Sequence, residues 1–181
     1  MDEKILVLVY PGLGKTWVAE NFANVIDFEQ QHYTFIYDDD IKDLPLEQIK
    51  SDASKRRPNP DWPNNFISGV NMALKSNDIV ITTFIPKVYK AILSADYQNV
   101  RIILATFNHE NFEELAERFR ARGNSEDFVE RRRADFSIVN QLLQKDKTNE
   151  KIIVESGEYL ASALIKYGVK LLPGKGQKNY I

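Results

Sequence analysis

The segment VYPGLGKT, residues 9–16, brings glycines, a lysine and a hydroxyl together in the spacing of a phosphate-binding loop. Gly12 and Gly14 permit backbone angles at which successive N–H groups point at one anion. Lys15 would neutralise the β- and γ-phosphates of a nucleoside triphosphate, and the hydroxyl of Thr16 would ligate Mg²⁺. The sequence therefore predicts a site for ATP and Mg²⁺. Its expected nucleotide-binding residues are Pro11, Gly12, Leu13, Gly14, Lys15, Thr16 and Trp17.

Two features depart from the full pattern of such loops. The consensus reads G-x-x-x-x-G-K-[ST], and Val9 stands where its first glycine is expected. The third apolar run reaches Thr82 and Thr83 without the acidic residue that many P-loop ATPases carry at that strand end. Mg²⁺ is then left with the hydroxyl of Thr16, with water and with Asp27 as a further candidate ligand. These departures argue against a motor ATPase, but not against phosphate binding.

The loop lies between elements that can position it, because an apolar run precedes it and a helical pattern follows it. Short apolar runs then alternate with amphipathic segments along the chain, which predicts an α/β fold whose parallel sheet is covered on both faces. The segment 38–65 is the least regular part of the chain, with a short helix considered near residues 46–51, and its prolines argue against regular structure after residue 55. The predicted strands are 4–9, 24–29, 78–84, 100–107 and 151–154, and the predicted helices include 16–23, 65–74, 86–95, 108–122, 125–143 and 157–167.

Bulk composition excludes several kinds of protein. The 181 residues are 43% apolar and 28% charged, which is ordinary for a soluble globular domain. A formal net charge of −2 provides no positive field, so we expect no stable nucleic-acid binding. The absence of cysteine excludes disulfides and thiolate chemistry and is compatible with the cytoplasm, where we expect the protein. No apolar run has the length of a transmembrane helix, so we expect no membrane binding.

The loop resembles that of the nucleoside and nucleotide kinases that are similar to adenylate kinase. Those enzymes carry G-x-P-G-x-G-K, and residues 9–15 read V-Y-P-G-L-G-K. A weaker similarity to nucleotide kinases found in phages and bacteria covers VID at 25–27, NPDWPNNF at 59–66 and RFRARGN at 118–124. The resemblance implies a three-layer P-loop NTPase fold with a five-stranded parallel sheet in the order 2-3-1-4-5.

The resemblance also implies how the chain is divided. We expect a single kinase-like domain, 1–181, with a substrate flap at 38–65, a lid-like segment at 118–133 and a tail at 172–181. Phosphoryl transfer needs positive charge around the moving group, and arginines of the lid-like segment could supply it. Arg118 and Arg122 are four residues apart and so share a helix face. The alternative is a solvated surface on which nearby carboxylates balance these arginines. The expected catalytic residues are Lys15, Arg122, Arg118 and Asp27.

Candidate acceptor-binding residues lie around the flap. Asp27 ends the second predicted strand, at the edge where open α/β sheets bind ligands, and it could hold a Mg²⁺-bound water, a sugar hydroxyl or a transferred proton. In the flap, Arg56 and Arg57 could clamp an acceptor phosphate, and Trp62 could stack on a base. The alternatives are a turn-capping aspartate and a surface loop pinned by one tryptophan.

Three functions are compatible with these residues. The first is ATP-dependent phosphoryl transfer to a nucleoside monophosphate, which needs no base, or to a nucleoside, which would use a carboxylate such as Asp27 or Glu29. The second is a kinase of another small metabolite, in the manner of shikimate or gluconate kinases. The third is a module that binds nucleotide without catalysis. The expected partners are small-molecule nucleotides, and the sequence leaves open whether the chain forms a homodimer.

Overall fold

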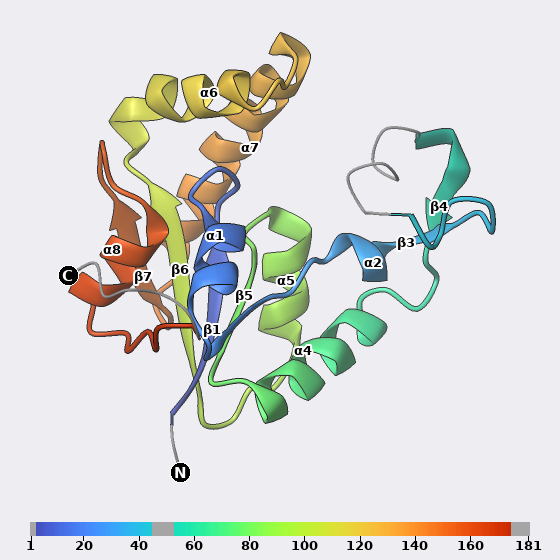
Figure 1. Cartoon of the computed structure of the whole chain (residues 1–181), viewed down its shortest axis with the longest axis horizontal. Helices are drawn as coiled ribbons and strands as arrows, with labels where there is room; N and C mark the ends of the chain where they lie inside the picture. Colours follow the sequence, from blue (N-terminus) through green and yellow to red (C-terminus); the bar gives the residue numbers. More distant parts are fainter. Residues whose placement is uncertain (1–2, 45–52, 175–181) are drawn as a thin grey trace.

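The computed structural model describes residues 3–44 and 53–174, and a parallel sheet with helices on both faces forms its centre (Figure 1). The strands of this sheet are β1 (Lys4–Val9), β2 (Val25–Asp27), β5 (Ile79–Thr83), β6 (Val100–Phe107) and β7 (Glu150–Val154). They lie in the order β2-β5-β1-β6-β7, and every neighbouring pair is parallel. Counted within this sheet the order is 2-3-1-4-5, so the predicted topology is confirmed.

Continuous apolar runs form these strands because both faces of the sheet are covered. The side chains of β1 from Ile5 to Val9 are all buried, which fits its central place between β5 and β6. Right-handed crossovers place helices on both faces, and α1 contacts α8 while α5 contacts α7. The main helices are α1 (Lys15–Asn21), α4 (Asn64–Ser76), α5 (Pro86–Ser94), α6 (Phe112–Ala121), α7 (Glu126–Lys145) and α8 (Leu160–Lys166).

A small hairpin-like sheet stands apart from the central one (Figure 1). Here α2 (Gln31–Thr34) leads into β3 (Phe35–Tyr37), and η1 (Ala53–Lys55) leads into β4 (Arg56–Pro58). β3 and β4 pair antiparallel, with Tyr37 opposite Arg56 and Phe35 opposite Pro58. The prediction that prolines prevent regular structure after residue 55 is therefore wrong for 56–58. Pro58 ends an edge strand, where a missing N–H group costs no ladder hydrogen bond.

Several helices begin or end a few residues away from their predicted bounds. Asn108 caps the short turn η2 (His109–Asn111) instead of α6, because its side chain accepts a hydrogen bond from the backbone of Glu110. The helix predicted for 16–23 ends at Asn21, since Phe22 is extended and pairs with Pro173. Ser125 is the N-cap of α7, so this helix begins near its predicted start, and it extends to Lys145 instead of ending at residue 143.

Two expectations fall partly outside the described ranges. The short helix considered near residues 46–51 lies wholly outside them, and of the tail only 172–174 are described. These three residues lie against the turn that follows α1. The backbone N–H of Leu172 donates to Asn24 Oδ1, and that of Gly174 donates to the carbonyl of Asn21.

Candidate functional site

The phosphate-binding loop connects the end of β1 to the start of α1. Gly12 and Gly14 both have a φ of +93°, a backbone conformation that side-chain-bearing residues rarely adopt. Gly14 is the N-terminal cap residue of α1, and no side chain caps this helix end. The first N–H groups of α1 have no intrahelical partner either. They are therefore available to an anion bound in the loop, as the sequence predicts.

Val9 does not disturb the loop. It is the last residue of β1 and pairs in register with Thr83 on one side and Ala105 on the other. Val9 thus takes the place of the first consensus glycine at the end of a regular strand, where no left-handed backbone conformation is needed. Backbone hydrogen bonds to both neighbouring strands continue at this point. The N–H of Phe84 donates to the carbonyl of Val9 at 2.7 Å, and the N–H of Tyr10 donates to the carbonyl of Ala105 at 2.9 Å.

Three helices pack directly on the loop. A Cβ atom on Gly12 would lie 2.7 Å from Leu115 Cδ1 of α6, so only glycine fits beneath this helix. The hydroxyl of Tyr10 donates to the carbonyl of Arg132 in α7. At the start of α8, the N–H of Leu160 donates to the carbonyl of Leu13 at 3.0 Å. The loop is therefore fixed by α6, α7 and α8 as well as by β1.

Lys15, Thr16 and Asp27 come together at the loop. Lys15 Nζ lies 2.7 Å from Asp27 Oδ1, and the hydroxyl of Thr16 donates to Asp27 Oδ2 at 2.8 Å. Glu29 is the next carboxylate, with Oε2 at 3.6 Å from Lys15 Nζ. Asp27 ends β2, whereas Lys15 and Thr16 follow β1. The contact therefore forms because the carboxyl ends of parallel strands share one edge of the sheet.

These side chains fit Mg²⁺. The hydroxyl of Thr16 and the carboxylate of Asp27 are adjacent oxygen donors of the kind that Mg²⁺ prefers, and Thr16 is exposed. Within residues 3–44 and 53–174, no group of three or more His, Asp or Glu side chains could enclose a metal ion. A magnesium ion held by Thr16 and Asp27 would therefore need further oxygens from nucleotide phosphates and water.

Arg118 of α6 stacks on the ring of Tyr159, and that ring packs against the phosphate-binding loop. Its guanidinium carbon lies 4.3 Å from the ring centre of Tyr159, and that ring lies 3.6 Å from the Cβ position of Gly14. Arg118 Nη2 donates to Glu114 Oε1 at 2.6 Å and to the carbonyl of Glu158 at 2.9 Å. Its Nη1 is buried, without a hydrogen-bond partner in the part of the chain that the structure describes. Arg118 therefore joins α6 to the segment before α8.

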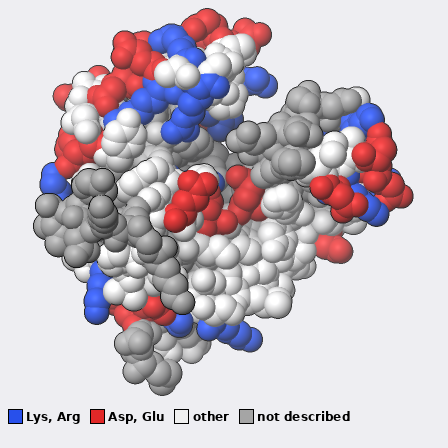
Figure 2. All heavy atoms as spheres, in the orientation of Figure 1, with Lys and Arg blue, Asp and Glu red and all other residues white. Residues whose placement is uncertain are grey.

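The other arginines of the lid-like segment are mostly neutralised by carboxylates. Arg120 pairs with Glu126 at 2.7 Å, Arg132 pairs with Asp135, and Arg133 has carboxylate partners as well. Figure 2 shows Lys and Arg side chains intermixed with Asp and Glu over the α6–α7 end of the molecule. Arg122 is exposed, and its side chain makes no ion pair or hydrogen bond with the residues that the structure describes.

On the opposite side of the site, two cations face aromatic rings. The guanidinium of Arg56 on β4 lies 4.5 Å from the ring centre of Phe35. Lys87 Nζ, at the start of α5, lies 5.3 Å from the same ring centre and 5.5 Å from that of Trp62. Arg57 follows Arg56 in β4, so its exposed side chain points to the other face of the strand.

Lys87 was missed by the sequence analysis. It follows Pro86 at the first turn of α5, directly beyond the end of β5, and that position is the signal that could have found it. Burial lowers the pKa of Lys87 below its ordinary value of 10.5, the charge of Arg56 lowers it further, and the charge of Glu29 offsets part of the effect. Lys87 and Arg56 therefore repel each other across a partly buried space.

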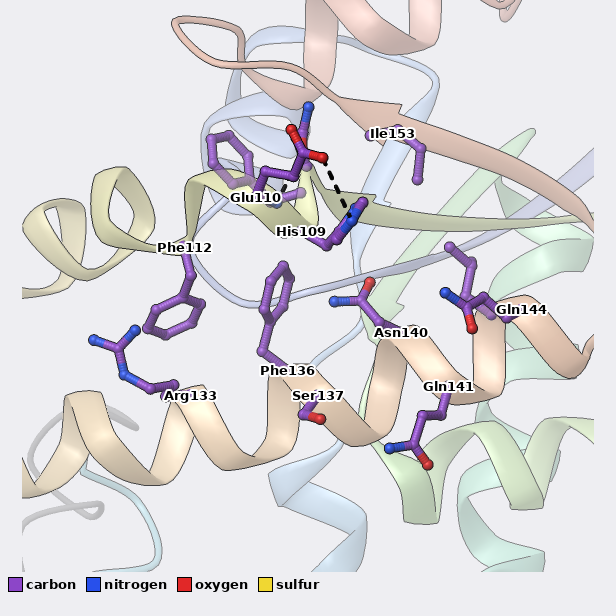
Figure 3. A pocket seen from close by; sticks show the side chains of 13 residues that line it. His109, Glu110, Phe112, Arg133, Phe136, Ser137, Asn140, Gln141, Gln144 and Ile153 are labelled. Atoms are coloured by element: carbon purple, nitrogen blue, oxygen red, sulfur yellow. Dashed lines mark hydrogen bonds and ion pairs between the residues drawn. The ribbon is translucent and has the colours of Figure 1, made fainter.

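A separate open cavity of about 800 Å³ lies between α7, η2 and β7 (Figure 3). None of the expected nucleotide- or acceptor-binding residues lines it. Its charged groups have partners: Arg133 pairs with Glu113, and His109 lies 4.0 Å from Glu110. This cavity therefore adds nothing to the phosphate site. Separately, no helix in the described ranges combines the length and apolarity needed to cross a membrane.

Comparisons with known proteins agree with the fold. No protein-family model matches the chain, and no curated protein was found to match it. A tunicamycin resistance protein from Deinococcus radiodurans is similar in structure, with a TM-score of 0.51 and 12% identity over 94% of this chain and 98% of that one. A gluconokinase from Sinorhizobium meliloti 1021 has a TM-score of 0.45 and 18% identity, over 91% and 89%. The chain has a three-layer P-loop fold.

Proposed function

We propose that this protein transfers the γ-phosphoryl group of ATP to a small-molecule acceptor. One observation carries the proposal. Lys15 and Thr16 follow a glycine loop that three helices hold in place, and both contact Asp27 at the end of β2, two strands away from β1 in the sheet. This arrangement puts phosphate-binding groups, two Mg²⁺-ligating oxygens and a carboxylate at one edge of the sheet, which are the parts that phosphoryl transfer needs.

Each residue has a defined task in this proposal. The loop N–H groups bind the phosphates, and Lys15 moves from Asp27 to the β- and γ-phosphates. Thr16 and Asp27 would hold Mg²⁺, which neutralises phosphate charge. Asp27, released from Lys15, is also placed to accept a proton from an acceptor hydroxyl. The acceptor oxygen then bonds to the γ-phosphorus, the bond from that phosphorus to the bridging oxygen breaks, and ADP leaves.

The arginines divide between two tasks. Arg118, stacked on Tyr159 beside Gly14, would position the donor nucleotide next to the loop. Arg122, exposed at the end of α6 beside the glycine that terminates the helix, would supply positive charge to the moving phosphoryl group. Both assignments remain proposals.

A nucleoside or nucleoside monophosphate is the first acceptor that we propose, in agreement with the loop's resemblance. Another small hydroxyl-bearing metabolite is the second candidate, and a specific observation favours it. Asp27 and Glu29 both lie at Lys15, at 2.7 and 3.6 Å. Carboxylates at this point suit proton removal from a hydroxyl, whereas a phosphate acceptor needs no base.

The test is ADP release from Mg-ATP with a panel of nucleosides, nucleoside monophosphates and sugar acids, using Lys15→Ala as the inactive variant. Lys90→Ala on the exposed face of α5 is the matched control for loss of a lysine charge. We expect one acceptor to stimulate ADP release in the wild type and in Lys90→Ala only. If Mg-ATP binds but no acceptor raises release above the Lys15→Ala level, the protein is a nucleotide-binding module instead.

A further inference from the structure

Two positive charges near the acceptor side have no carboxylate partner in the part of the chain that the structure describes. Within the described ranges, neither Arg56 nor Lys87 lies within ion-pairing distance of an Asp or Glu side chain. Most other arginines form such pairs, among them Arg101, which bonds bidentately to Glu150. An unpaired cation that is partly buried is costly, and a second cation nearby increases the cost. A ligand that brings negative charge would remove this cost.

Aromatic rings bound the space around these two cations. Both charges lie over the ring of Phe35, and Lys87 also lies over the ring of Trp62. Trp62 is itself held against Phe66, with ring centres 5.1 Å apart. Cation–π contacts of this kind orient the ammonium and guanidinium groups without occupying their N–H donors, and Tyr37 is a polar neighbour of Arg56. Lys87 Nζ has one marginal hydrogen bond, to the hydroxyl of Thr34 at 3.5 Å.

Glu29 connects this space to the phosphate-binding loop. Its carboxylate lies 3.6 Å from Lys15 Nζ and also acts electrostatically on Lys87 and Tyr37. Two residues before it, Asp27 contacts Lys15 directly. Glu29 is thus close enough to act on both the loop lysine and Lys87, and Asp27 lies beside the same loop lysine. A molecule bound by that pair could therefore present a hydroxyl to the carboxylates.

We infer that the acceptor is an anionic alcohol: Arg56 and Lys87 bind its carboxylate or phosphate group, while its hydroxyl faces Asp27 and Glu29. This inference rests on the proposed function, and it narrows the acceptor to one class. Neutral nucleosides and sugars lack the group that would neutralise the pair. Charge-assisted hydrogen bonds from a guanidinium and an ammonium give such an anion both affinity and orientation. Removing one of the two cations should weaken binding about tenfold or more.

The two tryptophans allow the inference and the proposed function to be tested separately. The chain has only Trp17, next to the phosphate loop, and Trp62, next to Lys87. In a Trp17→Phe chain, fluorescence reports the acceptor space, and in a Trp62→Phe chain it reports the nucleotide site. The probes are two matched pairs, gluconate with glucose and thymidine 5′-monophosphate with thymidine. They distinguish a carboxylate from a phosphate and each anion from its neutral counterpart.

We expect Trp62 fluorescence to respond saturably to at least one anion, with an affinity about tenfold or more above that of its neutral counterpart. Lys87→Gln and Arg56→Gln should each weaken this binding about tenfold, whereas Lys87→Arg and the control Lys90→Gln should retain it. Thermal unfolding of each variant checks that it folds. If either Lys87→Gln or Arg56→Gln fails to fold, the other variant still tests the inference.

Three results would overturn the inference: no response to either anion, equal affinity for a neutral counterpart, or anion binding unchanged in both Lys87→Gln and Arg56→Gln. A response of Trp17 fluorescence to Mg-ATP in the Trp62→Phe chain would show that the donor site binds nucleotide even if the inference about the acceptor fails. Loss of that response, with anion binding intact, would instead count against the proposed function.

Discussion

The donor side and the acceptor side of this site are built differently. On the donor side, α6, α7 and α8 pack on the glycine loop, and carboxylates pair with nearby arginines such as Arg118 and Arg120. On the acceptor side, a two-stranded sheet and the start of α5 present Arg56 and Lys87, which have no carboxylate partner among residues 3–44 and 53–174. The difference indicates that packing fixes the backbone of the donor side before binding, while the acceptor side would gain a missing charge from its ligand. Substitutions on the donor side should therefore lower the free energy of unfolding, whereas substitutions on the acceptor side should change the affinity for the acceptor.

The largest loss of stability should come from Gly12→Ala, at the packing contact between the loop and α6. The alanine would need a positive φ, and its Cβ would overlap Leu115. We expect a loss of about 3 kcal/mol in the free energy of unfolding, from backbone strain and overpacking together. Gly123→Ala is the matched control, because Gly123 also has a positive φ but nothing lies within 4 Å of its Cβ position. Chemical denaturation measures both, and an equal loss in the two variants would refute tight packing on the loop.

Arg118→Gln tests the second donor-side contact. The substitution removes bonds to Glu114 and to the carbonyl of Glu158, where the side chain is 11% exposed. We expect the free energy of unfolding to fall by about 2 kcal/mol, since the glutamate loses a charged partner in a partly buried place. Affinity for Mg-ATP, read from Trp17, should fall as well because Tyr159 loses its support. A variant with wild-type stability would show that this contact is incidental.

A feature of this site could be predicted from the sequence when the residues that form it lie close together along the chain. The loop is local, so its place between the first strand and the first helix could be predicted from the spacing of its residues alone. The apolar runs predicted the strands of the central sheet, whereas their order came from the resemblance to nucleotide kinases alone. Asp27 could be placed because it ends a strand at the ligand-binding edge.

The missed features depend on contacts between distant segments. Lys87 is a single lysine after a proline, and only the pairing of β3 with β4 brings Arg56 and Phe35 to it. No spacing rule predicts that pairing, and Pro58 argued against it. Arg118 could be proposed from helix spacing, but its contact with Tyr159 joins segments 41 residues apart (159 − 118).

On the acceptor side, Lys87→Gln should not reduce stability at neutral pH, and we expect a gain of less than about 1 kcal/mol. Burial and Arg56 lower the pKa of Lys87, so the unfolded chain holds this proton to higher pH than the folded chain does. Stability contributed by the wild-type residue therefore rises with pH between the lowered pKa and 10.5. The advantage of the variant should shrink over that range. Thermal unfolding at several alkaline pH values measures this, and an advantage that grows with pH would contradict the unpaired-cation account.

The smallest effect should come from Arg120→Gln, on the exposed surface of α6. Arg120 bonds to Glu126 and lies 3.6 Å from Glu113, all in contact with solvent. Surface ion pairs contribute less than about 1 kcal/mol, and salt screens them. The variant should unfold within about 1 kcal/mol of the wild type, and the difference should diminish further at high salt. A larger, salt-independent loss would place Arg120 with Arg118 among the structural contacts of the donor side.

The central claim is phosphoryl transfer, and its most direct test follows the phosphoryl group itself. The protein would be incubated with Mg²⁺ and ATP labelled at the γ-phosphate, together with the acceptor panel, and the labelled products would be separated. The account predicts label on one organic acceptor with the wild-type protein and none with Lys15→Ala. Label that stays on ATP, or reaches only inorganic phosphate to the same extent in both proteins, would contradict it.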